Sequence, residues 1–381
     1  MQPITSKLPR TGTTIFTLMS KMAQQHDAIN LSQGFPNFEV DPKLIELVNQ
    51  AMKNGHNQYA PMAGLFSLRE IIAEKVERLY QKSYSPEHEI TITSGATQAI
   101  FTAIAAVIRP GDEVIVFKPA YDSYEPSIEI FGGTVVPIQL QAPHFTPDWD
   151  EVASKINDKT KMVIINSPHN PSGTIWDKED MLKLENHLKH TNILLLSDEV
   201  YEHIIFDDAT HQSACMFPGL AERGFITASF GKTFHTTGWK MGYCLAPKVL
   251  MEEFRKVHQF NVFCSNHPIQ SALSEYLKQP EHYEALPHFY QQKRDLFLSL
   301  LKGSKFTFTP SAGTYFQLLD YSAITDERDV DFAERLTKDY KIASIPTSVF
   351  NLNQQDNKLL RFCFAKTDDT LKRAAEILCS V

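Results

Sequence analysis

Short apolar runs alternate with longer amphipathic stretches through the middle of the chain. Apolar runs bounded by turn residues predict strands, which fall at residues 89–93, 113–117, 162–166, 193–197, 225–229 and 242–246. Apolar residues at helical spacing predict helices between several of these strands, at residues 97–108, 149–156 and 178–190. Buried strands separated by helices are typical of a largely parallel sheet that helices cover on both faces.

Helical patterns also flank this central part. One helix is predicted at residues 15–25, and a second carries one apolar face made of Leu65, Leu68, Ile72, Val76 and Leu79. After residue 247, helices are predicted at residues 248–262, 268–277 and 282–301. The last of these is long enough to bridge two domains. A smaller α+β segment follows, with predicted strands at 315–319 and 359–364 and a helix at 369–378.

The composition is that of an ordinary soluble globular protein. The chain has 381 residues, 43% of them hydrophobic, and this length favours two domains because single hydrophobic cores stop growing below it. A net charge of −8 without a basic run argues against nucleic-acid binding. Five scattered cysteines indicate reduced thiols, and without a CxxC or HExxH motif we expect no metal site. The N-terminal residues and apolar stretches lack signal-peptide or membrane-spanning character, so we expect a cytoplasmic protein.

Chemically active residue types follow five of the predicted strands. In parallel sheets ligands bind beyond the carboxyl ends of the strands, so these residues would meet at one edge. They are Ser94-Gly95-Ala96-Thr97, Tyr121, Asn170, Asp198 with Tyr201, and Lys232. Helix caps and turns would explain any one of them alone, because Asn-Pro, Ser-Gly and Asp are ordinary turn or cap residues. Five such ends at one edge favour a binding site.

Lys232 follows the predicted strand at 225–229 and stands among Phe230, Phe234 and Trp239. Apolar surroundings disfavour the ammonium form and lower the pKa of a lysine, which makes its amine a nucleophile. Such an amine suits Schiff-base chemistry with a carbonyl group. A surface lysine after a strand is the alternative interpretation of this residue taken alone.

Arg361 stands within the apolar strand predicted at 359–364. A charged side chain is rarely buried without a partner. Its planar guanidinium would suit a substrate carboxylate, which it can hold by two parallel hydrogen bonds. An ion pair within the protein or an edge position would also explain an arginine here.

A phosphate and an aromatic ring are two groups that this edge would accommodate. The N-terminus of the helix near Thr97, aided by Ser229 and Lys240, would hold a phosphate, because free N–H groups and the helix dipole attract anions. Tyr121 would stack on a ring, and Asp198 would keep a ring nitrogen protonated.

The remaining residues complete the match to one cofactor. Asn170 and Tyr201 would hydrogen-bond a phenolic oxygen, and Lys232 would form an imine with an aldehyde. Pyridoxal 5′-phosphate carries all of these groups on one pyridine ring. The sequence therefore predicts an enzyme that uses this cofactor, with Arg361 receiving the carboxylate of the substrate.

The motifs resemble those of the class I/II aminotransferases, which are fold type I pyridoxal-phosphate enzymes. The resemblance rests on His169-Asn170-Pro171-Ser172-Gly173, Ser197-Asp198-Glu199-Val200-Tyr201, Ser229-Phe230-Gly231-Lys232 and Gly238-Trp239-Lys240. Residues 58–64 and 201–204 are most similar to the branch of methionine aminotransferases and kynurenine–glutamine transaminases. The resemblance implies an α/β fold: a large cofactor-binding domain at 41–280 around a mostly parallel sheet, and a small α+β domain built from 1–40 and 281–381.

The resemblance also implies a role for each matching residue. Lys232 would form the imine and act as acid and base, Asp198 would contact the pyridine nitrogen, and Tyr201 and Asn170 would contact the phenolic oxygen. Tyr121 would stack on the ring. The residues implied at the phosphate are Gly95, Ala96, Thr97, Ser229 and Lys240, with Tyr59 reaching it from the other subunit of a homodimer. The substrate carboxylate would be received by Arg361, the Gly34 backbone and Asn170.

The choice of substrate is the least constrained part of the expectation. No second arginine is identified for a side-chain carboxylate, and Ile15, Phe16, Tyr59 and Met62 are plausible apolar neighbours of the substrate side chain. We therefore expect a large apolar, sulfur-containing or aromatic donor, methionine first, and a 2-oxo acid acceptor in a ping-pong exchange. The chain departs from many relatives in having Lys240 instead of arginine and Ser172 instead of threonine.

Four other functions share some of these sequence features. Ser229-x-x-Lys232 matches part of the signature of penicillin-binding serine enzymes, but the S-D-N and K-T-G motifs that these enzymes require are absent. A β-eliminating carbon–sulfur lyase, or a kynurenine–oxoglutarate transaminase, would share the cofactor and the fold. A regulator on the same fold would need an added DNA-binding domain, for which we expect no room.

Overall fold

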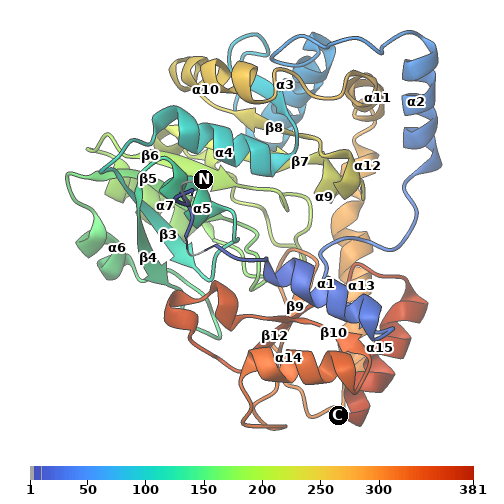
Figure 1. Ribbon diagram of the computed structural model, residues 1–381. Coiled ribbons are helices and arrows are strands. Elements are labelled where there is room, and N and C mark those ends of the chain that lie inside the picture. Colours follow the sequence, from blue (N-terminus) through green and yellow to red (C-terminus); the bar gives the residue numbers. More distant parts are fainter. Residues whose placement is uncertain (1–3, 10) are drawn as a thin grey trace.

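A seven-stranded sheet forms the centre of the computed structural model, which describes residues 4–9 and 11–381 (Figure 1). The strands lie in the order β2-β8-β7-β6-β5-β3-β4. Their bounds are β2 (Ile90–Thr93), β3 (Glu113–Lys118), β4 (Thr134–Gln139), β5 (Thr160–Asn166), β6 (Leu194–Asp198), β7 (Gly224–Ser229) and β8 (Gly242–Leu245). Only β8 among them runs against the others, so the prediction of a mostly parallel sheet is confirmed.

The edge strand β4 is the one that the apolar pattern does not predict. It pairs with β3 alone. Pro137 interrupts its apolar run, and proline is tolerated at a sheet edge because no second neighbour needs its missing N–H. Most of its residues are only half-buried, unlike those of the central strands.

Helices cover both faces of the central sheet. Val114 and Val116 of β3 share an apolar core with α4 and α10, while Ile115 and Phe117 share another with α3 and α7. Alternate side chains of a strand point to opposite faces, and each fully buried Val or Ile contributes about 1.5–3 kcal/mol. The main helices of this part are α2 (Pro42–Lys53), α3 (Phe66–Tyr80), α4 (Ala96–Val107), α5 (Tyr124–Ile130), α6 (Trp149–Lys155), α7 (Lys178–Leu188), α9 (Phe230–Thr233), α10 (Lys248–Asn261) and α11 (His267–Tyr276).

The first and last parts of the chain come together beside this sheet. Figure 1 shows the blue helix α1 next to α14, and β1 pairs in parallel with β10. A second, antiparallel sheet has the order β11-β12-β9. The elements here are α1 (Ile15–Gln25), β1 (Ile29–Asn30), β9 (Phe316–Asp320), α14 (Asp329–Lys338), β10 (Ile342–Ala343), β11 (Ile345–Pro346), β12 (Leu359–Cys363) and α15 (Asp368–Ser380).

The prediction of a single helix at 282–301 is wrong in one respect, because the structure divides this segment into two helices. A short α12 (Glu281–Glu284) ends before α13 (Leu286–Leu300) begins. Pro287 lies in the first turn of α13, where its missing N–H costs nothing, whereas inside a continuous helix its ring would clash with the preceding turn. Within the described residues, no helix is both long and apolar enough to cross a membrane.

Candidate active site

A cavity of about 170 Å³ lies at the carboxyl ends of the parallel strands. Residues from the ends of β2, β3, β5, β6 and β7 meet there, as expected when parallel strands share one edge. The structure brings together most of the residues that the sequence singles out: Gly95, Ala96, Thr97, Tyr121, Asn170, Asp198, Tyr201, Ser229, Lys232 and Lys240.

One end of the cavity is suited to an anion. Gly95 precedes α4 with a φ of +79°, and no side chain caps the first turn of that helix. A Cβ at Gly95 would lie 3.5 Å from the Lys240 Nζ, so the lysine stands directly over this turn. Uncapped N–H groups, the helix dipole and a cation together attract negative charge.

Asp198 ends β6 as a fully enclosed carboxyl group. It accepts hydrogen bonds from the Tyr124 hydroxyl at 2.6 Å and from the Val200 N–H at 3.3 Å. Burial raises the pKa of Asp198 to about 6, although the Tyr124 bond opposes that rise. Sequence reasoning missed Tyr124. It begins α5 three positions after Tyr121, and only the packing of α5 brings its hydroxyl to Asp198.

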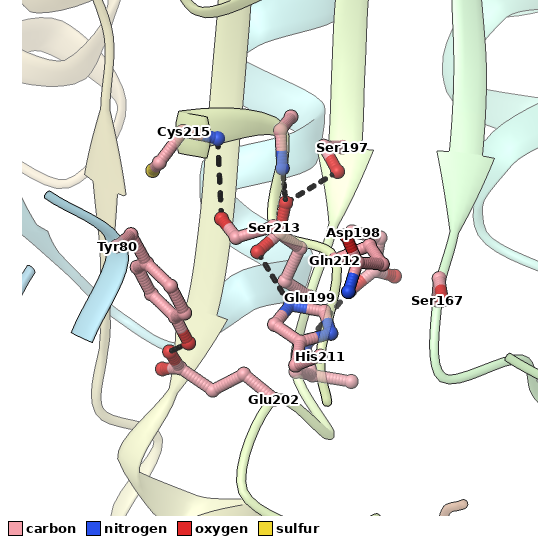
Figure 2. A network of polar contacts seen from close by, with 12 residues as sticks. Tyr80, Ser167, Ser197, Asp198, Glu199, Glu202, His211, Gln212, Ser213 and Cys215 are labelled. Carbon is pink, nitrogen blue, oxygen red and sulfur yellow. Dashed lines mark hydrogen bonds and ion pairs between the residues drawn. The ribbon is translucent and has the colours of Figure 1, made fainter. Parts of the chain in front are cut away.

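Two further acids lie close to Asp198 and bind other partners, as Figure 2 shows. Glu199 accepts hydrogen bonds from the Ser197 hydroxyl at 2.7 Å and the Ala214 N–H at 2.9 Å, and it contacts His211 Nε2 at 2.8 Å. These bonds hold the chain on either side of Asp198. The orientation of the Asp198 carboxyl is therefore set by neighbours on both sides.

Glu202 belongs to a buried ion pair behind the same segment. It accepts hydrogen bonds of 2.6 Å from Lys75 Nζ and from the Tyr80 hydroxyl (Figure 2 shows the Tyr80 bond). Burial alone would raise the pKa of Glu202. The charge of Lys75 and the hydrogen bonds that Glu202 accepts outweigh this effect and hold the pKa of Glu202 well below its usual range. The pair ties α3 to the segment that carries Asp198 and Tyr201.

Lys232 lies in the short helix α9, which Ser229 caps by accepting a hydrogen bond from the Lys232 N–H. Its Nζ donates a hydrogen bond of 3.2 Å to the carbonyl oxygen of Gly34. Protein atoms surround the amine, and this desolvation lowers the pKa of Lys232 to about 8. The amine is desolvated, as expected, but the rings that lie near it are those of Tyr201 and Tyr315, at 5.9 and 5.7 Å from Nζ.

Asn166 joins two of the predicted residues, although sequence reasoning gave it no role. Its side chain donates to the Asp198 carbonyl at 2.9 Å and accepts from the Asn170 N–H at 2.9 Å. Beside them, Tyr201 is buried, and burial raises the pKa of its hydroxyl above the usual range. Tyr201 therefore keeps its proton and can donate it to a ligand oxygen.

Arg361 lies on β12, is only 1% exposed, and borders the cavity through Asn170. Its guanidinium donates to Asn170 Oδ1 at 2.6 Å and to the Ser32 carbonyl at 3.0 Å, and lies 3.8 Å from the centroid of the Phe316 ring. Its Nε has no hydrogen-bond partner within the described residues. Burial lowers the pKa of Arg361 to about 10, so it stays charged at neutral pH.

The comparisons with known proteins decide the family. A family model for aminotransferase class I and II matches residues 26–378. The chain belongs to the class I and II aminotransferases. Enzymes of this family use pyridoxal 5′-phosphate, and the cofactor expected from the sequence is thereby confirmed. This aminotransferase also has the fold type I architecture of its structural neighbours.

Individual relatives cover nearly the whole aminotransferase chain. It is 50% identical to the methionine aminotransferase of Escherichia coli (strain K12), over 98% of this chain and 97% of that protein. It is 34% identical to the human kynurenine–oxoglutarate transaminase 3, over 94% of this chain and 86% of that protein. A solved structure from Escherichia coli, reported to identify a methionine aminotransferase function, matches with a TM-score of 0.98 at 49% identity over 100% of both chains.

Two observations indicate that the residues of this aminotransferase can hold the cofactor. The uncapped first turn of α4 beneath Lys240 is a cradle for a phosphate group. The buried carboxyl of Asp198 can face a protonated ring nitrogen, which would keep the carboxyl ionised despite its raised pKa. Lys232 lines the same cavity, within which an aldehyde could meet its amine.

The remaining predicted residues of the aminotransferase do not line this cavity. Tyr59 is 82% exposed and packs edge-on against Phe263 at 5.3 Å. Ile15 is half-buried at the start of α1, and its neighbour Phe16 lies 5.2 Å from the Arg361 guanidinium. Gly34 contacts Lys232 through its carbonyl, and a Cβ there would lie 2.7 Å from the Phe316 ring.

Proposed function

We propose that this aminotransferase transfers the amino group of an apolar, sulfur-containing or aromatic L-amino acid, methionine first, to a 2-oxo acid. The main support is that the Arg361 guanidinium lies at the border of the cavity, while the described residues that line the cavity include no arginine. A donor such as aspartate would need a second cation for its side-chain carboxylate. The 50% identity to a protein named methionine aminotransferase supports the first choice.

Asp122 supports a donor without a side-chain carboxylate. It follows Tyr121, and burial raises the pKa of its carboxyl while the charge of Arg361 opposes that rise. A second substrate carboxylate near Arg361 would meet this acid, and two carboxylates disfavour each other's ionised form. We therefore infer that Met, Phe, Tyr, His, Leu or kynurenine are better donors than Asp or Glu.

The residues proposed to hold the cofactor divide by the group that they contact. Tyr121 would stack on the ring, and the phosphate would be held by Gly95, Ala96, Thr97, Ser229 and Lys240. When bound, the cofactor supplies an aldehyde for the amino group and a pyridine ring that withdraws electrons from the substrate. The substrate carboxylate would be bound by Arg361 and Asn170, beside the Gly34 backbone.

The catalytic roles are proposed for Lys232, Asp198 and Tyr201. With a pKa of about 8, a useful share of the Lys232 amine is neutral near pH 7, and a neutral amine can take a proton from the substrate Cα. Asp198, held by Tyr124, would keep its negative charge against the ring nitrogen. Tyr201 and Asn170 would hold the phenolic oxygen.

A homodimer in which each Tyr59 reaches the cavity of the other subunit is part of the proposal. Tyr59, Phe260 and Phe263 are 82%, 88% and 44% exposed, and exposed aromatic side chains of this kind are typical of interaction surfaces. Sedimentation would show a dimer. Tyr59→Phe would weaken cofactor binding, whereas a monomer that binds the cofactor fully would contradict the dimer.

The division into domains and the cytoplasmic location also remain proposals. The pairing of β1 with β10 supports a small domain made of residues 1–40 and 281–381, beside a large domain at 41–280. The five cysteines have no disulfide partner, which supports a reducing compartment.

Two related activities are the alternatives that the test must separate. Kynurenine–oxoglutarate transaminase is favoured by the 34% identity to a human protein of that name. A carbon–sulfur β-lyase would use the same cofactor, and the fold does not separate it from a transaminase.

A panel of amino donors against several 2-oxo acids tests the proposal. We expect methionine among the best donors, and strong preference for aspartate with no activity on methionine would overturn the donor assignment. Release of pyruvate and ammonia from cysteine conjugates without an acceptor would favour the lyase. Lys232→Ala should bind the cofactor without covalent attachment and lose about 10²–10⁴-fold in rate. The exposed Lys256→Ala serves as the control and should match the wild type.

A further inference from the structure

Two donors share the carbonyl oxygen of Gly34. The Tyr315 hydroxyl donates a hydrogen bond of 2.6 Å to this oxygen, and Lys232 Nζ donates one of 3.2 Å. A carbonyl oxygen has two lone pairs and can accept both. No sequence motif assigns a role to Tyr315, and no part of the proposed function uses it.

The Tyr315 ring is held in place on several sides. The residue is fully buried, and its ring meets those of Tyr201 at 5.1 Å, Phe316 at 5.0 Å and Tyr290 at 5.8 Å. The contacts with Tyr201 and Phe316 are edge-to-face and the contact with Tyr290 is tilted, and together they fix the position of the ring. The fixed ring places the hydroxyl beside the Gly34 carbonyl oxygen, to which it donates its single proton.

The Gly34 carbonyl is also restricted from its own side. A Cβ at Gly34 would lie 2.7 Å from the Phe316 ring, so the backbone lies directly on that ring. The neighbouring carbonyls are anchored as well, that of Ser32 by Arg361 at 3.0 Å and that of Phe35 by Lys366 at 2.8 Å. Among the residues that the structure describes, the Tyr315 hydroxyl alone shares this oxygen with the Lys232 amine.

We propose that Tyr315 is a positioning residue that fixes the Gly34 carbonyl as the acceptor for the free Lys232 amine. With one N–H directed to Gly34, the amine has a defined orientation, and its lone pair stays available for the substrate proton. This inference rests on the proposed role of Lys232 in proton transfer. It adds Tyr315, a residue of the proposed small domain, to the residues that determine the rate.

The hydrogen bond also affects the charge state of the amine. The groups that act electrostatically on Lys232 are Cys363, Arg361, Lys240 and Asp198, and the Tyr201 and Tyr315 rings lie 5.9 and 5.7 Å from its Nζ. While the Gly34 carbonyl accepts a hydrogen bond from Tyr315, it is a weaker acceptor for the Lys232 ammonium group. Without the Tyr315 hydroxyl, the Gly34 oxygen would accept from the Lys232 ammonium group alone. The charged form of Lys232 would then be more stable, and its pKa would rise.

Tyr315→Phe and the matched control Tyr290→Phe test the proposal in the holoenzyme. Tyr290 is also buried in this ring cluster, but its hydroxyl contacts His235 Nδ1 at 2.9 Å and not Gly34. We expect Tyr315→Phe to lower kcat about tenfold, change KM less than about twofold, and move the acidic limb of the kcat profile to higher pH. Tyr290→Phe should change neither kcat nor its pH profile. Equal effects of both variants would overturn the proposal.

A readout without turnover separates this inference from the proposed activity. The enzyme is loaded with pyridoxamine 5′-phosphate, which leaves the Lys232 amine free, and reductive methylation of Lys232 is followed against pH by peptide mass spectrometry. We expect the apparent pKa of Lys232 in Tyr315→Phe to lie about 0.5–1 unit above the wild-type value. An unchanged pKa together with an unchanged kcat profile would overturn the inference. If no donor is turned over but this pKa still rises, the proposed function fails and the inference about Tyr315 holds.

Discussion

Arg361 Nη1 donates a hydrogen bond of 2.6 Å to Oδ1 of Asn170. Arg361 lies on β12 of the sheet β11-β12-β9, and Asn170 lies in the loop after β5 of the seven-stranded sheet. The bond therefore links these two sheets at the cavity. Asn170 lines the cavity itself and is tied through Asn166 to Asp198. The arginine proposed to bind the substrate carboxylate and the residues proposed to hold the cofactor are therefore parts of one connected arrangement.

Arg361→Lys should damage substrate binding more than folding. Lysine cannot form the planar fork that holds a carboxylate, and its shorter reach would lose the Asn170 and Ser32 contacts together. We expect kcat/KM for methionine to fall about 100-fold, mainly through a higher KM, because one charge-assisted pair contributes about 1.5–3 kcal/mol. Arg335→Lys, which changes a surface arginine paired with Glu327, should leave the kinetics unchanged. Steady-state kinetics on both variants make the comparison.

The rate should follow the charge state of Lys232. Burial lowers the pKa of Lys232 from 10.5 to about 8, so the amine is mostly charged below that pH and mostly neutral above it. Proton abstraction needs the neutral form, and therefore kcat at saturating donor should rise with pH and reach half its maximum near 8. Stopped-flow measurements between about pH 6 and pH 10 cover this range. A midpoint near 10.5 would show that the amine is not desolvated during the reaction.

Lys240→Ala should release the cofactor more readily. The side chain stands over the uncapped first turn of α4, where it would add a charge to the helix dipole. Losing one charge-assisted contact of about 1.5–3 kcal/mol predicts a Kd for the cofactor that is about 10–100-fold higher. Equilibrium dialysis measures this change. Lys248→Ala, an exposed lysine at the start of α10, is the control, and an equal effect there would contradict the assignment.

Glu202→Gln should destabilise the protein and leave Lys75 buried without its anion. Removing one partner of a buried pair costs about 3–5 kcal/mol in the free energy of unfolding. The pKa of Glu202 is held below its unfolded value of 4.5, so its contribution to stability is complete above that pH and is lost as the pH falls. The wild-type protein should therefore lose more stability than Glu202→Gln on acidification.

Denaturant unfolding at neutral and acidic pH tests this prediction. Glu253→Gln removes the acid of an exposed pair with Lys256 and should unfold like the wild type. A loss in Glu202→Gln no larger than in this control would show that the buried pair contributes nothing.

Local patterning was sufficient for much of the fold. The strands around Val114, Leu195 and Phe225 are continuous apolar runs because both of their faces are buried, and the structure places them where the sequence predicts. The predicted helix at 15–25 has the same bounds as α1. The break before Pro287 has a local cause, the proline itself, which the prediction of one helix at 282–301 overlooked. The edge strand β4 was missed because Pro137 interrupts its apolar run and its place at the sheet edge depends on pairing with β3.

The candidate site divides in the same way. Lys232, Asp198 and the α4 N-terminus stand at strand ends, and a parallel sheet brings such ends to one edge whatever the details of packing. Asn166 ends β5 and so has the same strand-end signal, although the sequence reasoning gave it no role, whereas Tyr124 and Tyr315 carry no comparable signal. Their roles arise from hydrogen bonds between elements far apart in the sequence.

The sequence by itself determined which residues gather at the sheet edge and which cofactor their chemistry matches. Only the tertiary structure decided how these side chains are oriented and charged. The pKa of Lys232 depends on the protein atoms that enclose it, and the Gly34 carbonyl meets it because the N-terminal loop packs on Phe316. Desolvation and hydrogen-bond direction are properties of the packed site, and spacing along the chain does not specify them.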